Sequence, residues 1–311
     1  MSVGVLLPRD LPVEQLVPYA RKAEALGFAE IWVVEDLPFR GGIAQAAVVL
    51  ASTDRIRVGV GILPAAVRNP AFAAMEASTL AALYPGRLVL GVGHGMPGWI
   101  SQVGAWPDSP LTLLEEHLSA VRALLHGDRV TLDGRYVHLD GVQLYAPPAE
   151  PPPVLAGVRG PRSLALAGRV ADGVVLAEPV TPEYLAMVAR SVGRPVPVVA
   201  YCVAAVDRDA DAARDRVRLA LDWIGEPDWE PHIAPLPFAD EFRALRAASG
   251  SRAEFLRRMP APWVDQLAVV GTPDGARRRL AELHAAGVTC AVLIPAGPDA
   301  FGELDGLASL V

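Results

Sequence analysis

The stretch Pro85–Trp99 reads PGRLVLGVGHGMPGW, a short apolar run that continues into closely spaced glycines. This pattern is typical of a buried strand whose following loop brings its backbone close to a bound group. Gly93, Gly95 and Gly98 also match the G-x-G-x-x-G spacing of dinucleotide-binding loops. We reject that interpretation, because Pro97 interrupts the motif and strand–helix units precede it, whereas the fingerprint belongs in the first βα turn. The stretch instead predicts a strand inside a repeating strand–helix fold, followed by a turn that binds an anion or simply closes the loop.

Three strand–helix units precede this stretch. The apolar runs 3–7, 31–34 and 56–63 are predicted strands, and 11–26, 44–51 and 69–83 are predicted helices. Gly27 is placed to end the first helix as a C-cap. Asn69 and Pro70 are placed as the N-cap and first residue of the third helix.

Further units follow it along the chain. The predicted strands are 88–92, 154–156, 173–176, 196–206 and 289–294, and the predicted helices are 111–125, 162–170, 209–223 and 272–286. Parallel strands need crossover helices, and a doubly wound sheet rarely holds eight strands. The pattern therefore predicts a (β/α)8 barrel, with residues 1–311 forming a single domain.

Two segments depart from the repeat. Thr112 and Glu115 are placed to begin the predicted helix 111–125 as a capping box. After this helix, residues 133–134 (Asp-Gly) within an alternating run predict a tight hairpin. This hairpin is a small insertion at about 127–146. Residues 225–265 are rich in proline and aromatic residues, and we interpret them as a lid-like insertion that packs over the barrel mouth.

Composition excludes several classes of protein. With 52% hydrophobic and 20% charged residues the chain can bury one large core, and its net charge of −7 offers no basic face for nucleic acid. No run of 18 apolar residues predicts a membrane span, and we expect no leader segment, because Met1 leads directly into a strand. The cysteines, Cys202 and Cys290, lie in apolar runs and fit buried thiols in a reducing cytoplasm. The six histidines lack metal-ligand spacing, so no metal site is expected.

Functional residues of such a barrel lie at the carboxyl ends of its strands. These ends are scattered through the sequence, but the fold would bring them to one face. They are Pro8, Arg9, Glu35, Asp36, 62–64, Gly93, His94, 157–160, Glu178, Tyr201, Pro295 and Ala296. We expect them to line one pocket.

An ordered set of motifs makes the family recognisable. It comprises ALGF at 25–28, IWVVED at 31–36, RVGVGILP at 57–64, RNP at 68–70, PGRLVLGVG at 85–93, AGRVADG at 167–173 and GTP at 271–273. The set resembles the bacterial luciferase-like family of flavin- and deazaflavin-dependent oxidoreductases over nearly the whole chain. The resemblance implies a barrel that binds FMN or the deazaflavin coenzyme F420 at its mouth.

The resemblance also implies roles for residues of the second and third strands. It places a non-proline cis peptide at Gly61–Ile62, forming a bulge behind the middle ring of the cofactor. The alternative is an ordinary trans strand with a glycine for packing. Asp36 resembles the family's hydrogen-bond partner of the cofactor head. The next position is often a histidine that transfers a proton, but here it is Leu37.

Three other titratable residues near the predicted mouth could supply the proton: Glu35, His94 and Glu178. A carboxylic acid in an apolar pocket can have a raised pKa suited to donation. Each also has a structural interpretation. Glu35 could cap the next helix, His94 could bond to backbone in its turn, and Glu178 could pair with Arg159 or Arg162.

The phosphate side of the cofactor is predicted in the loops after the fourth and fifth strands. Backbone amides there can bind an anion near a helix N-terminus, and Arg159 or Arg162 can add a charge-assisted bond. The expected cofactor-binding residues are Asp36, Gly61, Ile62, Gly93, His94, Gly95, Gly157, Val158, Arg159 and Gly160.

The resemblance favours a hydride-transfer oxidoreductase that uses reduced F420 and an organic acceptor with a C=C, C=N or C=O bond. The short chain and the motifs at 35–36, 68–70 and 91–93 look like the F420-dependent subgroup. An FMN-dependent monooxygenase and a non-catalytic cofactor-binding barrel are the alternatives. The substrate is a small molecule of unspecified identity. We also expect a homodimer, because family barrels pair through early helices and residues 44–50 are small and apolar.

Overall fold

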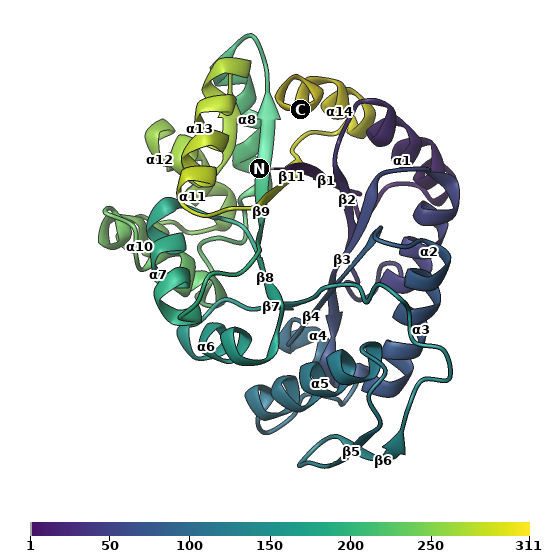
Figure 1. Cartoon of the computed structure of the whole chain (residues 1–311). Helices are drawn as coiled ribbons and strands as arrows, with labels where there is room; N and C mark the ends of the chain where they lie inside the picture. The colour runs from purple at the N-terminus through teal and green to yellow at the C-terminus, as the bar shows by residue number, and fades with distance from the viewer. Residues whose placement is uncertain (1) are drawn as a thin grey trace.

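Eight parallel strands close into a barrel in the computed structural model, which describes residues 2–311 (Figure 1). They are β1 (Ser2–Leu6), β2 (Glu30–Val33), β3 (Arg57–Pro64), β4 (Leu88–Gly93), β7 (Val154–Gly157), β8 (Gly173–Leu176), β9 (Val198–Val206) and β11 (Cys290–Pro295). Neighbouring strands follow the order β9-β11-β1-β2-β3-β4-β7-β8, and the pairing of β8 with β9 closes the ring. The predicted (β/α)8 barrel is confirmed.

The strands are apolar along their length because both of their faces are covered. Every residue of β2, β4, β8 and β9 is buried. One cluster contains Trp32, Leu155, Tyr201 and Val292, while a second and larger cluster lies between the strands and the surrounding helices. The barrel is therefore a packed core, and ligand chemistry is confined to its ends.

Helices surround the strands (Figure 1). They include α1 (Leu16–Ala25), α2 (Gly42–Ser52), α3 (Pro70–Leu83), α5 (Pro110–Leu125), α6 (Pro161–Val170), α8 (Ala210–Ala220) and α13 (Pro273–Ala285). The predicted helix ends at Gly27 and Asn69 are confirmed. Gly27 has a φ of 92°, and the Asn69 side chain accepts a hydrogen bond from the Ala71 N–H at 2.9 Å. None of the helices within residues 2–311 is long and apolar enough to cross a membrane.

Some elements are not predicted by the sequence pattern. They are α4 (Pro97–Gln102), α7 (Pro182–Val192), α14 (Ala300–Leu307) and the strand β10 (Val269–Gly271). β10 pairs with the last part of β9, Ala204 to Val206, beyond the barrel ring. Three residues are too few to show a period, so only this pairing identifies the strand.

The predicted capping box of α5 is wrong. The helix begins at Pro110 with Ser109 as its N-cap, because proline is well suited to the first helical position. Thr112 lies inside the first turn, and its hydroxyl is 2.8 Å from the Ser109 hydroxyl.

The hairpin is present, as β5 (Val130–Asp133) and β6 (His138–Val142). It lies at the edge of the molecule beside α5 (Figure 1). The tight Asp-Gly turn is wrong, because the loop spans residues 134–137 and Asp133 pairs with His138. Glu116 of α5 accepts hydrogen bonds from the backbone N–H groups of Arg135, Tyr136 and Val137 at 2.8, 2.9 and 3.0 Å. This anchoring carboxylate selects the longer loop.

The segment 225–265, which we call the insertion, is helical. It contains the 3-10 turn Pro227–Trp229 and the helices α9 (Glu230–Ile233), α10 (Ala239–Ala247), α11 (Arg252–Arg258) and α12 (Ala261–Leu267). Its aromatic residues pack with α8 and one side of β9 in a core of their own. Met96 and Ala296, from two loops at the carboxyl ends of strands, join that core. The insertion therefore adjoins the mouth of the barrel.

Candidate active site

Charged side chains from four strand ends face one another at the carboxyl end of the barrel. Arg9 follows β1, Asp36 follows β2, Arg159 follows β7 and Glu178 follows β8. Arg9 Nη1 donates a hydrogen bond to Asp36 Oδ2 at 2.8 Å. Burial raises the pKa of Glu178, and the charges of Arg159, Asp36 and Arg9 also act on it. Arg159 and Asp36 therefore lie close enough to Glu178 for their charges to act on it.

The bond between Gly61 and Ile62 of β3 is the predicted floor of the cofactor site. The bond is cis, as predicted. Tyr201 of β9 donates a hydrogen bond from its hydroxyl to the Gly61 carbonyl at 3.2 Å, and Trp32 meets the Tyr201 ring edge-on. A Cβ on residue 61 would lie 2.0 Å from the Tyr201 hydroxyl oxygen. Glycine is therefore required here by close packing.

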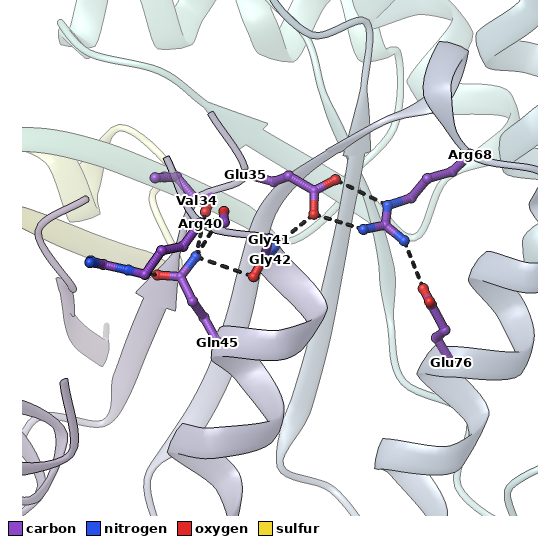
Figure 2. Close-up of polar contacts among 8 residues, drawn as sticks. All are labelled: Val34, Glu35, Arg40, Gly41, Gly42, Gln45, Arg68 and Glu76. Atoms are coloured by element: carbon purple, nitrogen blue, oxygen red, sulfur yellow. Dashed lines mark hydrogen bonds and ion pairs between the residues drawn. The ribbon is translucent and has the colours of Figure 1, made fainter. Parts of the chain in front are cut away.

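Glu35, one of the predicted proton donors, is fully engaged by other groups (Figure 2). Arg68 donates to both of its carboxylate oxygens, Nε to Oε1 at 3.0 Å and Nη2 to Oε2 at 2.8 Å. The Gly42 N–H at the start of α2 donates to Oε2 at 2.6 Å. Arg68 also pairs with Glu76 of α3 at 2.8 Å. The bidentate pair and the hydrogen bond from the start of α2 use both carboxylate oxygens, so Glu35 is best explained as the cap of α2.

Gln45 shapes the loop that carries Asp36, and the sequence offered no signal for this role. Its side-chain amide is buried in α2 and donates to the carbonyls of Val34, Arg40 and Gly41 at 2.9, 3.2 and 3.4 Å (Figure 2). A buried amide that bonds to three carbonyls restricts the backbone on either side of Asp36.

His94 follows β4 and points to the start of α6. Its Nε2 lies 3.1 Å from the Ser163 hydroxyl. Burial lowers its pKa, and a contact with the Pro110 backbone partly opposes this shift. His94 is therefore a neutral bridge between two helix starts, and Ser163 is the partner that sequence reasoning missed.

The predicted glycines of the phosphate loops have packing roles. A Cβ on Gly93 would lie 2.5 Å from the Gly157 carbonyl oxygen, and one on Gly157 would lie 2.4 Å from the Ile62 side chain. Gly95 has a φ of 73° and packs against Ile100. Val158 is buried in the core, so only its backbone can face a ligand. These positions explain the glycines without requiring a bound group.

Arg159 and the start of α6 have the features of an anion site. Arg159 makes no ion pair within residues 2–311. Its guanidinium lies over the Trp229 ring, with its carbon 4.4 Å from the ring centroid. Gly160 precedes α6, has no side-chain cap, and a Cβ built on it would meet no atom within 4 Å. Arg162 is exposed on the first turn of the same helix. A free guanidinium beside an uncapped helix start, with open space above it, suits a phosphate group.

Glu178 is half-buried, and in the described part of the chain it forms no ion pair with Arg159 or Arg162. Burial is the main cause of its raised pKa, which a hydrogen bond from its own backbone N–H and the nearby positive charges only partly offset. Its backbone is held from the insertion, because Trp229 Nε1 donates to the Glu178 carbonyl at 2.8 Å. Of the predicted acids, Glu178 is the one whose carboxyl group has no side-chain partner among residues 2–311.

These residues fit a phosphorylated flavin-type cofactor. A backbone bulge supported by Tyr201 could serve as a floor, Asp36 could supply a hydrogen-bonding group, and Arg159 with the start of α6 could hold an anion. No group of three or more His, Cys, Asp or Glu side chains that could bind a metal ion occurs among residues 2–311.

Comparisons with known proteins agree with this geometry. The profile of the family described as "Luciferase-like monooxygenase" matches residues 1–290. A 5,10-methylenetetrahydromethanopterin reductase of Methanolobus tindarius is 32% identical over 96% of each chain. An F420-dependent glucose-6-phosphate dehydrogenase of Nakamurella multipartita is 36% identical over 52% of this chain and 51% of its own.

Solved structures share the fold. The coenzyme F420-dependent tetrahydromethanopterin reductase from Methanopyrus kandleri superposes with a TM-score of 0.85 at 22% identity, covering 100% of this chain and 98% of its own. The FMN complex of the 3,6-diketocamphane monooxygenase component from Pseudomonas putida has a TM-score of 0.74 at 16% identity, covering 100% and 96%. At these identities the superpositions establish the barrel fold, and they do not select between the two cofactors.

Proposed function

The chain belongs to the luciferase-like family, and from this premise we propose that it is an oxidoreductase that uses coenzyme F420 to reduce an organic acceptor with a C=C, C=N or C=O bond. The proposal rests on one observation. Arg159, which makes no ion pair, and the half-buried Glu178 lie at the same mouth of the barrel. Relatives with F420 in their names support the choice of cofactor, and a relative that matches nearly the full chain is a reductase.

Cofactor binding is proposed for two sides of the mouth. Arg159, with the amides at the start of α6, would hold a phosphate, and Asp36 would hydrogen-bond to the cofactor head. Arg9 orients Asp36 through their 2.8 Å contact. The backbone at Gly61 and Ile62 would lie behind the rings.

Glu178 is proposed as the proton donor. When bound, reduced F420 supplies a hydride, which brings two electrons and one hydrogen to the acceptor carbon. The other atom of the reduced double bond then needs one proton to give a neutral product. A carboxyl group with a pKa raised by burial holds that proton nearer to neutral pH than an exposed one. Leu37 has no proton to give, and Glu35 and His94 are engaged by Arg68 and Ser163.

A direct test is to titrate the purified protein with oxidised F420 and, separately, with FMN, following tryptophan fluorescence. We expect quenching by F420 and none by FMN. Reduced F420 should then be oxidised in the absence of oxygen when a suitable acceptor is added. Quenching by FMN alone, with turnover that consumes oxygen, would instead establish the monooxygenase alternative, which the family description and the FMN-bound neighbour keep open.

The protein is also proposed to pair with a second copy of itself through α2 and α3. The outward face of these helices carries Val48, Phe72, Met75 and Leu83, which are 43%, 65%, 49% and 65% exposed. The sequence of α2 contains no charged residue, and α3 contains only Glu76. Such a large apolar face is unusual on a monomer and suits a self-complementary interface.

Light scattering at micromolar concentration tests the pairing. We expect twice the 32.9 kDa chain mass, and the Phe72→Lys variant should shift to the single-chain mass. Val13→Lys, at a 70% exposed position outside this face, is the matched control and should remain paired. A wild-type protein with the mass of one chain would contradict the proposal.

The compartment is proposed to be the reducing cytoplasm. Cys202 and Cys290 are free thiols and both are buried, as expected of cysteines that pack as small apolar residues. Cell fractionation of a tagged protein tests this proposal, and recovery outside the cytoplasmic fraction would contradict it.

A further inference from the structure

Trp229 of the insertion contacts both residues to which the proposed function gives the main roles. Its indole Nε1 donates to the Glu178 carbonyl at 2.8 Å, and its ring lies against the Arg159 guanidinium, 4.4 Å from carbon to centroid. The side chain is 6% exposed. One buried side chain thus joins the loop of the proposed acid to the proposed anion site.

A second pair of residues holds the same two loops. His232, fully buried in α9, donates from Nδ1 to the Pro179 carbonyl at 3.0 Å, and burial lowers its pKa to about 3, so the ring is neutral. Its ring lies against Tyr184 of α7 with centroids 4.1 Å apart. Tyr184 donates its hydroxyl hydrogen to the Arg159 carbonyl at 2.9 Å. The backbones of Arg159 and of Glu178–Pro179 are therefore held by directional bonds.

Trp229 is itself supported from behind. Trp223 stacks on it with centroids 6.3 Å apart and planes 25° apart, and the Arg252 guanidinium lies 4.1 Å from the Trp223 centroid. The four side chains form a ladder in the order Arg159, Trp229, Trp223 and Arg252. Each cation–π contact holds a flat group against its neighbour, so the ladder favours the Arg159 orientation in which its guanidinium lies on Trp229.

We propose that Trp229 is a positioning residue, which holds Arg159 toward the cofactor anion and keeps it from pairing with the Glu178 carboxylate. The inference rests on the proposed function and adds to it a role for the insertion. A purely structural role for Trp229 predicts a loss of stability and nothing more. The positioning role predicts changes in anion affinity and in the titration of Glu178.

The charges that surround Glu178 determine the direction in which its pKa should change. Arg159 comes from the loop after β7, Arg9 from the loop after β1, Asp36 from the loop after β2 and Tyr201 from β9. Without the indole, Arg159 can swing to Glu178, and an opposite charge favours the carboxylate. The pKa of Glu178 should therefore fall, because Arg159 moves closer to it while Arg9, Asp36 and Tyr201 keep their places.

The test uses the full chain with Trp229→Leu, Trp229→Phe and the control Trp263→Leu. Trp263 lies in the same insertion and stacks on Phe238 at 4.7 Å, away from both loops. Binding of oxidised F420 is followed by the anisotropy of its own fluorescence. The Glu178 carboxyl is titrated by carbon NMR of protein with labelled glutamate, with Glu178→Gln identifying its signal.

We expect Trp229→Leu to weaken F420 binding about tenfold, within the range for loss of one buried cation–π contact, and to lower the pKa of Glu178. The effect on binding should vanish in an Arg159→Met background. Trp229→Phe keeps an aromatic face and loses the indole N–H. Because the retained ring still holds Arg159, this variant should bind F420 within about twofold of wild type and keep the Glu178 titration near its wild-type position.

The inference is overturned if Trp229→Leu is folded, binds F420 like Trp263→Leu and leaves the Glu178 titration at its wild-type position. If the leucine variant does not fold, Trp229→Phe decides, and an F420 affinity about tenfold weaker than wild type or a lowered Glu178 pKa in that variant would overturn the inference. Failure of the wild-type protein to bind F420 would count against the proposed function. The Glu178 titration is measured without cofactor, so it would still decide whether Trp229 restrains Arg159.

Discussion

Two glutamates follow buried strands at the same face of the barrel, yet their surroundings differ. Glu35, after β2, receives two hydrogen bonds from Arg68 and one from the start of α2. Glu178, after β8, has its carbonyl bound by Trp229 while its carboxyl has no ion-pair partner in the part of the chain that the structure describes. The first arrangement stabilises a charge and the second makes that charge costly. The same residue type therefore serves as a cap in one loop and as a candidate acid in the other.

The largest expected effect separates the two residues by chemistry. Glu178→Gln should lower turnover by about 10²- to 10⁴-fold, the usual contribution of a general acid, with F420 binding retained. The measurement is the oxidation of reduced F420 with an acceptor that supports turnover. Glu35→Gln is the matched variant and should lower turnover far less. Equal losses in the two variants would remove the distinction drawn between them.

The second effect concerns stability on the β2 side. Arg68→Ala leaves Glu35, in a mostly buried site, with only the hydrogen bond from the start of α2. We expect a loss of about 2 to 3 kcal/mol in the free energy of unfolding, measured with urea. Arg169→Ala is the control, because its pair with Glu115 is exposed at both ends, 59% and 44%. That variant should lose less than about 1 kcal/mol. If Arg68→Ala loses no more stability than Arg169→Ala, the hydrogen bonds around Glu35 contribute little to the free energy of unfolding.

The third prediction concerns Asp36, which lies next to Glu35 in the same loop. Asp36→Ala should weaken F420 binding by about 1 to 3 kcal/mol, the cost of a lost hydrogen bond at a buried site, while the barrel remains folded. Fluorescence titration gives the affinity and circular dichroism the fold. An unchanged affinity for F420 would mean that Asp36 only pairs with Arg9 and does not bind the cofactor.

The smallest effect is a difference in the pH dependence of stability. Because burial raises the pKa of Glu178 in the folded state, its ionisation opposes folding as the pH rises from the unfolded pKa through the folded pKa. Glu178→Gln should therefore gain stability relative to wild type at pH 7 and gain none near pH 4. Urea unfolding at both pH values measures this. A wild-type advantage at pH 7 would mean that the carboxylate has a stabilising partner.

Much of the fold follows from local sequence patterns. Continuous apolar runs and helical periods locate the eight barrel strands, and short-range signals such as Asn69-Pro70 locate helix starts. One error, in the hairpin, occurs where a distant group competes with the local signal. Glu116 of α5 draws the hairpin loop into a longer form than its Asp-Gly dipeptide predicts.

Of the candidate site, the sequence by itself determined which residue types stand at the strand ends, because strand periodicity and chain order place them there. Only the tertiary structure decided what each of them can do. Arg68 reaches Glu35 from 33 residues away, and Trp229 reaches the Glu178 backbone from 51 residues away. Hydrogen bonding, burial and nearby charge set the protonation of a carboxyl group, and these depend on contacts between distant segments that no local pattern records.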